Sequence, residues 1–236
     1  MNDMATIRIG SDEFSGEAVL YEKFSDLRRW RTLENHGGWT PGTDGLLAEW
    51  LEKSPSLFLK EKISGDYLWQ TRLSRLSPDE EFLRRFQASS HAKGADPERF
   101  YNFNFWLRAD APPAETFFDA YPKYLGTGWN GMGDDHWHSL FNTVVWWDKG
   151  NPDNWVRLRR SPGYEKMRDI QGIVPHLPYG EPHEFSFALQ GGRVRMYFDE
   201  TLVYDFADER AYASGYLGFC VWLCRIRYHE MKLYRL

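Results

Sequence analysis

The sequence predicts an all-β protein made of two packed antiparallel sheets, and three observations carry this prediction. Apolar and polar residues alternate with a period of two along most of the chain, and Gly, Pro, Asn and Asp interrupt them at short intervals. Helical periodicity is nearly absent. The length of 236 residues suits one all-β domain, so we expect a single domain over residues 1–236.

About twelve short strands are expected, without helical crossovers between them, which favours a two-sheet sandwich. Gly191-Gly192 and Asp199-Glu200 supply tight turns between three of the later strands. In chain order the expected strands are Val19–Phe24, Gly45–Trp50, Ser56–Leu59, Asp66–Leu73, Tyr101–Arg108, Ser139–Trp147, Trp155–Arg160, His183–Leu189, Arg193–Phe198, Thr201–Phe206, Gly215–Trp222 and His229–Arg235.

One short helix is expected near residues 79–88. Ser77 or Asp79 can cap its N-terminus, and acidic residues occupy its first turn. Its apolar stripe consists of Phe82, Leu83 and Phe86.

The composition excludes several classes of protein. A formal net charge of −5 gives the chain no overall attraction for nucleic acid or anionic membranes. A mean hydropathy of −0.62 with 42% apolar residues fits neither a membrane protein nor a disordered one. The N-terminus shows no secretory signal, and no apolar stretch approaches the length of a membrane span, so we expect a cytoplasmic protein. The oligomeric state stays open.

The two cysteines, Cys220 and Cys224, are expected to be free thiols. A strand would place both on one face, too far apart for a disulfide, and no further zinc ligands lie near them. No other metal site or cofactor motif is evident.

Tryptophan is in surplus, because the chain contains 11 Trp beside 13 Tyr and 16 Phe. Extra Trp is typical of flat stacking surfaces that bind sugars, although a core rich in aromatics would use it too. The irregular segment 110–138 is rich in aromatics and glycine, and we expect it to form an ordered loop that shapes a site.

Three polar faces are candidates for that site. Asn102, Asn104, Trp106 and Arg108 share one face of their strand and can bind hydroxyls, stack a sugar ring and pair a carboxylate. A second set follows the loop, where His136, His138 and Asn142 share a face if the strand begins early. The third set is Trp155, Arg157 and Arg159.

Each set also has a plainer interpretation. The first and third sets would serve equally as solvated surface strands with ion pairs and cation–π contacts. The histidines could act as a catalytic base, bind sugar, hold a metal or be structural. The motifs of nucleophilic hydrolases, nucleotide-binding loops and zinc proteases are absent, as is a strand with alternating carboxylates. Asp134 and Asp135 remain open as half of a carboxylate pair.

The second half of the chain resembles the YesU-like family of uncharacterised bacterial proteins. The matching segments are RLRRSPGY (Arg157–Tyr164), HEFSFALQGGRVRMYFDETLVYDFAD (His183–Asp208) and SGYLGFCVWLCRIRYHEMKLYRL (Ser214–Leu236), within residues 100–236. Arg159 and Gly163 match the Arg and Gly of the first segment. The chain departs from the pattern at the hairpin glycine, which is Glu200 or Thr201 here, and at Cys220, where the family has Arg.

The resemblance implies a concanavalin A-like jelly-roll sandwich, of the lectin/glucanase type. Related families include polysaccharide lyases, glycoside hydrolases and carbohydrate-binding modules, so it implies an oligosaccharide ligand without naming the sugar. A structural Ca²⁺ is common in such sandwiches, although no dense acidic loop demands one here.

Two functions follow as hypotheses. The first is β-elimination of an acidic or oxidised oligosaccharide at the concave face of the sandwich, with a glycoside hydrolase as an alternative enzyme. His136 or His138 would be the base, and Tyr124 or Tyr101 the acid. The charge-stabilising candidates are Arg108, Arg157, Arg159, Asn102 and Asn104.

The second hypothesis is a carbohydrate-binding protein without catalysis. It would stack sugars on Trp106, Trp129, Trp137, Trp146 and Trp155, with Asn142 as a further polar contact in either case.

Overall fold

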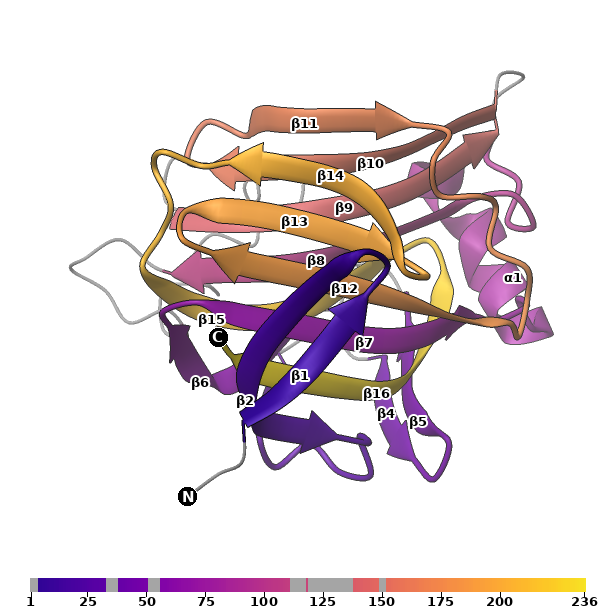
Figure 1. The fold of residues 1–236 in the computed structure, drawn as a ribbon. Helices are drawn as coiled ribbons and strands as arrows, with labels where there is room; N and C mark the ends of the chain where they lie inside the picture. Colours follow the sequence, from indigo (N-terminus) through magenta and orange to yellow (C-terminus); the bar gives the residue numbers. More distant parts are fainter. Residues whose placement is uncertain (1–3, 33–37, 51–55, 111–117, 119–137, 149–151) are drawn as a thin grey trace.

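The computed structural model describes residues 4–32, 38–50, 56–110, 118, 138–148 and 152–236. Within them, two antiparallel sheets pack face to face, and a short α-helix lies beside them (Figure 1). The predicted all-β fold class is therefore confirmed. Every strand pair in the two sheets is antiparallel.

The first sheet has nine strands. In pairing order its main path is β1 (Met4–Ile9), β2 (Asp12–Glu22), β16 (Arg225–Arg235), β7 (Tyr67–Arg75), β12 (Pro182–Gln190), β13 (Arg193–Phe198) and β14 (Thr201–Ala207). β5 (Gly45–Glu49) also pairs with β16, and β4 (Trp39–Gly42) pairs with β5. Both ends of the described chain meet in this sheet, because Met4 and Arg235 flank the same residue of β2, Glu17.

The second sheet has seven strands, and it carries the candidate site. In pairing order it contains β11 (Glu165–Gln171), β10 (Pro152–Ser161), β9 (His138–Asp148), β8 (Tyr101–Asp110), β15 (Ser214–Trp222), β6 (Ser56–Ser64) and β3 (Trp30–Thr32).

All twelve expected strands are present, and the structure adds β1, β3, β4 and β11. Each of these four pairs with a single neighbour, so each lies at an edge of its sheet. Edge strands carry charged and exposed residues, which weaken the alternation that marks central strands. β1 and β11 follow this rule, with mostly exposed or half-buried residues.

The predicted helix is confirmed as α1 (Glu80–Ala88), followed by a 3-10 turn, η1 (Ser90–Ala92). Asp79 is its N-cap and accepts a hydrogen bond of 2.8 Å from the Phe82 N–H. Phe82 and Phe86 are buried in a small cluster with Trp50, which fixes the helix against the sheets.

The main core lies between the sheets and is strongly aromatic. Trp69 of the nine-stranded sheet packs against Phe105 and Phe219 of the seven-stranded sheet, with ring centroids 5.7 and 5.2 Å apart. Phe187 adds a contact of 4.8 Å to Phe105. Many of the aromatic residues therefore belong to the core between the two sheets. This is the alternative explanation given above for the high Trp count.

A β-bulge in β8 changes which way its side chains point. Trp106 pairs with Phe141 of β9, but the next pair along the strand is Arg108 with Leu140, so Leu107 is the extra residue. Leu107 and Leu140 both belong to the core between the sheets. Arg108 is thereby turned inward, whereas Asn102, Asn104 and Trp106 keep the outward side.

The cysteines form no disulfide, and both are buried. Their expected common face was wrong, because β15 ends at Trp222 and Cys224 belongs to the core cluster beyond the strand. Burial raises the pKa of the Cys224 thiol to about 11. Within the described ranges, no helix is long and apolar enough to cross a membrane.

Candidate functional site

A hollow of about 310 Å³ lies on the outward face of the seven-stranded sheet. Strands β8, β9 and β10 form its floor, and the turn after β10 forms one wall. Of the described residues, those that line this hollow are Asn102, Thr143, Val145, Trp155, Arg157, Arg159 and Tyr164.

Strand pairing brings these side chains together. Residues that pair directly in an antiparallel ladder point to the same side of the sheet. Three rows of paired residues therefore cross the outward face, and they are Asn102–Val145–Trp155, Asn104–Thr143–Arg157 and Trp106–Phe141–Arg159.

Each arginine of the hollow stacks on an aromatic ring. The Arg157 guanidinium lies 4.3 Å from the Trp155 ring centroid, and that of Arg159 lies 4.0 Å from the Tyr164 centroid. Stacking holds a guanidinium by its face and leaves its N–H edge for hydrogen bonds.

The two arginines differ in their counter-ions. Arg157 donates from Nε to Asp169 at 3.0 Å, and Asp169 also accepts from Lys166 at 2.7 Å. Burial acts to raise the pKa of Asp169, but the hydrogen bonds from Lys166 and Arg157 outweigh it and hold that pKa below its usual value. Arg157 thus has a carboxylate partner, which it shares with Lys166.

Arg159 has no carboxylate partner among the described residues. Its Nη1 makes a long contact of 3.4 Å to the Tyr164 carbonyl, and its Nε has no hydrogen-bond partner. Burial, with Arg157 nearby, lowers the pKa of the Arg159 guanidinium against the opposing effects of Tyr164 and Asp169. A guanidinium remains charged at neutral pH, so the hollow presents an unneutralised positive charge.

Tyr164 reaches the hollow from the turn between β10 and β11. It has a φ of 52°, a left-handed backbone conformation that directs the chain back over the sheet. Burial raises the pKa of its hydroxyl despite the two nearby arginines. The side chain is therefore a protonated phenol at neutral pH.

The floor is polar and connected. Thr143 donates to the Asn104 side-chain oxygen at 2.6 Å, and the Asn104 amide lies 3.5 Å from the Asn102 oxygen. All three residues are nearly buried, so these contacts fix the direction of the amide of Asn102 at the surface of the hollow.

The structure brings together part of the predicted site. Asn102, Trp155, Arg157 and Arg159 line the hollow, and Asn104 supports it from beneath. Trp106 shares the outward face but is only 3% exposed, because it packs between Phe58 and Phe141.

Four predicted positions lie elsewhere. Arg108 points between the sheets because of the bulge. Asn142 and Trp146 lie on the face of β9 that points toward the other sheet. The Asn142 oxygen accepts a hydrogen bond of 3.0 Å from the Tyr204 hydroxyl. Trp146 packs on His176, with ring centroids 4.9 Å apart.

Tyr101, the fourth of these positions, is also in the core. Its hydroxyl contacts the Pro175 carbonyl and the Leu177 N–H, both at 3.3 Å, and burial raises its pKa. Because Tyr101 is buried in the core and does not line the hollow, it is not placed to act as an acid there.

The remaining predictions fall outside the described residues. They concern His136, Tyr124, Trp129 and Trp137, together with the side chain of His138, whose backbone begins β9. The expectation that segment 110–138 shapes the site falls there too.

Sequence reasoning missed Thr143, Val145 and Tyr164. Thr143 and Val145 lie on the outward face of β9, opposite to the face predicted from the sequence, which is that of His136, His138 and Asn142. Tyr164 ends the RLRRSPGY segment, where an aromatic residue follows Gly163 in a turn. A turn of this kind gives no periodicity from which a side-chain direction can be predicted.

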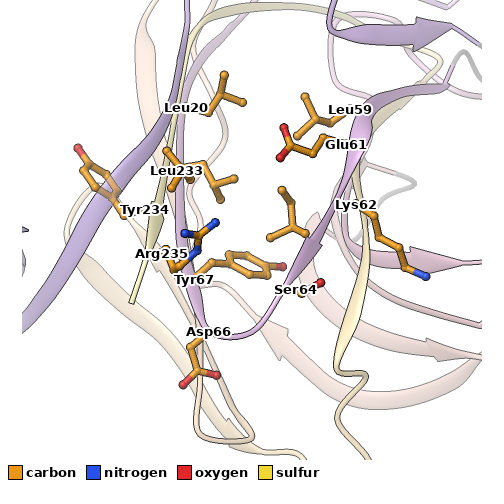
Figure 2. A pocket seen from close by; sticks show the side chains of 12 residues that line it. Leu20, Leu59, Glu61, Lys62, Ser64, Asp66, Tyr67, Leu233, Tyr234 and Arg235 are labelled. Atoms are coloured by element: carbon orange, nitrogen blue, oxygen red, sulfur yellow. The ribbon is translucent and has the colours of Figure 1, made fainter. Parts of the chain in front are cut away.

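A second cavity, of about 230 Å³, opens between the sheets near β2, β6, β7 and β16. Figure 2 shows Leu20, Leu59 and Leu233 around it, the Glu61 carboxylate turned toward it and Lys62 directed away. No described residue that lines it carries a buried side-chain polar atom without a hydrogen-bond partner. It offers less sign of a ligand than the hollow.

No described residues form a group of three or more His, Cys, Asp or Glu side chains that could hold a metal ion. The structural Ca²⁺ that is common in proteins of the resembled fold stays a prediction for this chain.

No protein-family model matches the sequence, and no curated protein matches it. Solved structures do match. A Bacillus subtilis protein of unknown function with a galectin-like fold has a TM-score of 0.63 at 12% identity, over 93% of this chain and 96% of that one. The carbohydrate recognition domain of Emp46p in its potassium-bound form has a TM-score of 0.59 at 11% identity, over 91% and 92%.

The carbohydrate-binding module CBM66 from Bacillus subtilis has a TM-score of 0.52 at 13% identity, over 86% of this chain and 94% of that one. Likeness at such low identity shows the fold alone. Together with the two antiparallel sheets, it shows that this chain has a galectin-like, concanavalin A-like β-sandwich fold.

Proposed function

We propose that the chain is a carbohydrate-active protein that binds an acidic sugar, a uronate or an oxidised sugar, in the hollow. The observation that carries this proposal is the Arg159 guanidinium, which lacks a carboxylate partner among the described residues and stacks on Tyr164 in an open site. Arginine pairs carboxylates through two parallel N–H···O bonds, so a sugar carboxylate supplies the missing partner.

The rest of the lining suits the sugar ring. Trp155 and Tyr164 provide aromatic surfaces, and the Asn102 amide and Thr143 hydroxyl can bind ring hydroxyls. The fold likeness adds support, because CBM66 and the Emp46p domain are carbohydrate-binding proteins. We also propose membership of the YesU-like family, as the segments RLRRSPGY and SGYLGF suggest. A single domain and a cytoplasmic location stay predictions.

β-Elimination at the same hollow is a second candidate function, favoured by the protonated Tyr164 hydroxyl beside Arg159. A base would remove the proton on the carbon next to the carboxylate, the C–O bond at the following carbon would break, and a C=C bond would form. The leaving oxygen would take a proton from Tyr164, and Arg159 would stabilise the enolate-like charge. His136 or His138 stays the predicted base.

A glycoside hydrolase has less support. That reaction uses two carboxyl groups roughly 5–10 Å apart. The described lining contains no carboxylate, and Asp169, which lies next to it, is held by both Arg157 and Lys166.

Calorimetric titration with oligogalacturonate, oligomannuronate and matched neutral oligosaccharides tests the proposal. We expect an acidic oligosaccharide to bind and its neutral counterpart to bind at least about tenfold more weakly, since a charge-assisted contact is worth more than one factor of ten. Arg159→Met should weaken acidic binding by about tenfold or more. Arg84→Met on α1 is the control, since Arg84 is exposed and forms an ion pair with Glu81.

Equal binding of acidic and neutral sugars, or equal effects of the two substitutions, would contradict the proposal. In the same mixtures, growth of the ultraviolet absorbance of an unsaturated product would show β-elimination. Binding without such growth would leave the carbohydrate-binding function and remove the lyase.

A further inference from the structure

A third cavity, the end cavity, is separate from the hollow and lies between the two sheets at one end of the sandwich. Its volume is about 460 Å³. The β6–β7 turn, the β12–β13 turn and the β14–β15 connection meet there, at the left of Figure 1. The hollow, in contrast, is on the outward face of the seven-stranded sheet, and the two sites share no described lining residue.

Most of the end cavity is apolar. Leu140 and Val194 are almost fully buried at its wall, and Leu189 is nearly so. Ala211 and Ala213 are exposed and line it from the β14–β15 connection. A wall of this kind favours a compact apolar group over a sugar ring, which would leave its hydroxyls unpaired.

Arg108 is a buried cation of this lining, because the β8 bulge turns it toward this end of the sandwich. Its residue is only 4% exposed. The guanidinium lies 5.2 Å from the Tyr67 ring centroid, interacts with the Tyr67 hydroxyl and donates from Nη2 to the Gly65 carbonyl. Its Nε and Nη1 have no hydrogen-bond partner, and no carboxylate of the described residues pairs with it.

Arg160, at the same end of the sandwich, differs from Arg108 in having a carboxylate partner, although its Nε also has no hydrogen-bond partner. It is 5% exposed, forms an ion pair with Asp208 and donates to the Arg210 carbonyl at 2.5 Å. Asp208 lines the end cavity; its Oδ1 accepts from Arg160 and from the Arg210 N–H, whereas its Oδ2 is buried without a hydrogen-bond partner. Asp66 lines it too, and accepts from the Gly191 N–H at 3.1 Å. Among the described residues, Arg108 thus lines the cavity without forming an ion pair to either carboxylate.

A buried charge without a partner is costly, and a carboxylate is the group whose geometry matches a guanidinium. We infer that the end cavity binds a small organic monocarboxylate, with its carboxylate on Arg108 and its apolar body against Leu140, Leu189 and Val194. This site is independent of the proposed sugar site, and neither depends on the other being correct.

Benzoate is a suitable probe, because it joins one carboxylate to a compact apolar ring. Calorimetric titration of the whole chain should show one benzoate bound per molecule. Benzyl alcohol and benzylammonium, which keep the ring without the negative charge, should bind at least about tenfold more weakly. Benzyl alcohol binding as tightly as benzoate would overturn the role of Arg108.

Two variants locate the probe. Arg108→Met keeps most of the apolar volume and should weaken benzoate binding by about tenfold or more. Arg84→Met is the control, since Arg84 is exposed on α1, forms an ion pair with Glu81 and does not line the cavity. It should leave the dissociation constant within about twofold. An equal loss in both variants would contradict a specific site.

If Arg108→Met does not fold, Ala213→Phe serves instead. It places a ring at an exposed position of the cavity wall, keeps Arg108, and should abolish benzoate binding by filling the space. Benzoate binding that survives in Ala213→Phe, or that is lost on Arg159→Met, would place the probe outside the end cavity and overturn the inference.

Discussion

Arg157 and Arg159 lie two residues apart on β10, but they differ in their hydrogen-bond partners. The Arg157 Nε donates a hydrogen bond to Asp169, whereas the Arg159 Nε has no hydrogen-bond partner. An incoming carboxylate therefore gains a new charge-assisted contact at Arg159, but at Arg157 it must compete with an existing one. The specificity of the hollow for acidic ligands is expected to depend on Arg159 first.

Tyr164 separates binding from catalysis. Tyr164→Phe keeps the ring under the Arg159 guanidinium and removes the hydroxyl. If the hollow catalyses β-elimination, we expect turnover of an acidic oligosaccharide to fall by roughly 10²–10⁴-fold, the usual contribution of a general acid. The dissociation constant should stay within about threefold, and both are measured on the same preparation. Unchanged turnover would remove Tyr164 as the acid.

Asp169 links the hollow to the pH dependence of stability. Its pKa is lowered in the folded chain, so its contribution is complete above the pKa of about 3.9 of an unfolded aspartate and is lost as pH falls through the depressed value. Asp169→Asn should reduce the free energy of unfolding at neutral pH by about 1 kcal/mol. Urea unfolding at pH 7 and at pH 3 measures the difference, which should shrink in acid. A constant difference would contradict the assignment.

At the scale of the element, the β8 bulge directs Arg108 to the end cavity instead of the hollow. Simple alternation groups Arg108 with Asn102, Asn104 and Trp106, and this grouping is correct up to the extra residue Leu107. Beyond it the parity reverses. Nothing in the run YNFNFWLRAD marks the bulge, because Leu107 and its neighbours fit a regular strand equally well. The sequence therefore predicts the strand itself but not the side to which Arg108 points.

β9 shows a different limit. The strand itself was predictable, but a polar residue was expected outside, and Asn142 is fully buried. Its oxygen accepts a hydrogen bond from Tyr204 of the opposite sheet, although its Nδ2 has no partner. Tyr204 is 62 residues away, so no local pattern reveals it. Arg157, Arg159 and Trp155 were correctly grouped because β10 alternates regularly with Val156 and Leu158 in the core.

The cap of α1 provides an element-scale prediction. Asp79→Ala removes the acceptor for the Phe82 N–H and the ion pair with Arg225. We expect the free energy of unfolding to fall by about 1–2 kcal/mol, as for other lost N-caps. Asp79→Asn is the control: it keeps a cap acceptor and should recover most of the loss. Urea denaturation monitors both, and equal losses would assign the effect to the ion pair.

At the scale of the whole molecule, the aromatic core ties the two sheets into one structure. Trp69→Ala removes contacts to rings of both sheets and should cost about 3–5 kcal/mol, the range found for large aromatic deletions. Tyr21→Ala is the control, since Tyr21 is 56% exposed and should cost less than about 1 kcal/mol. Thermal and urea unfolding measure both.

The same experiment tests the single-domain prediction. If both sheets form one cooperative unit, tryptophan fluorescence and far-ultraviolet circular dichroism should report one coincident transition in the wild type and in Trp69→Ala. Two separated transitions would show that the chain divides into units that unfold independently.

The meeting of the two ends of the described chain at Glu17 has a practical consequence. Met4 and Arg235 each lie one strand away from that residue, so they are separated by about two strand spacings, roughly 10 Å. Both belong to the nine-stranded sheet, while the hollow faces away from the other sheet. A fusion partner or a surface tether attached near Met4 or Arg235 would therefore lie on the side of the nine-stranded sheet. The hollow on the opposite side would stay open to solvent.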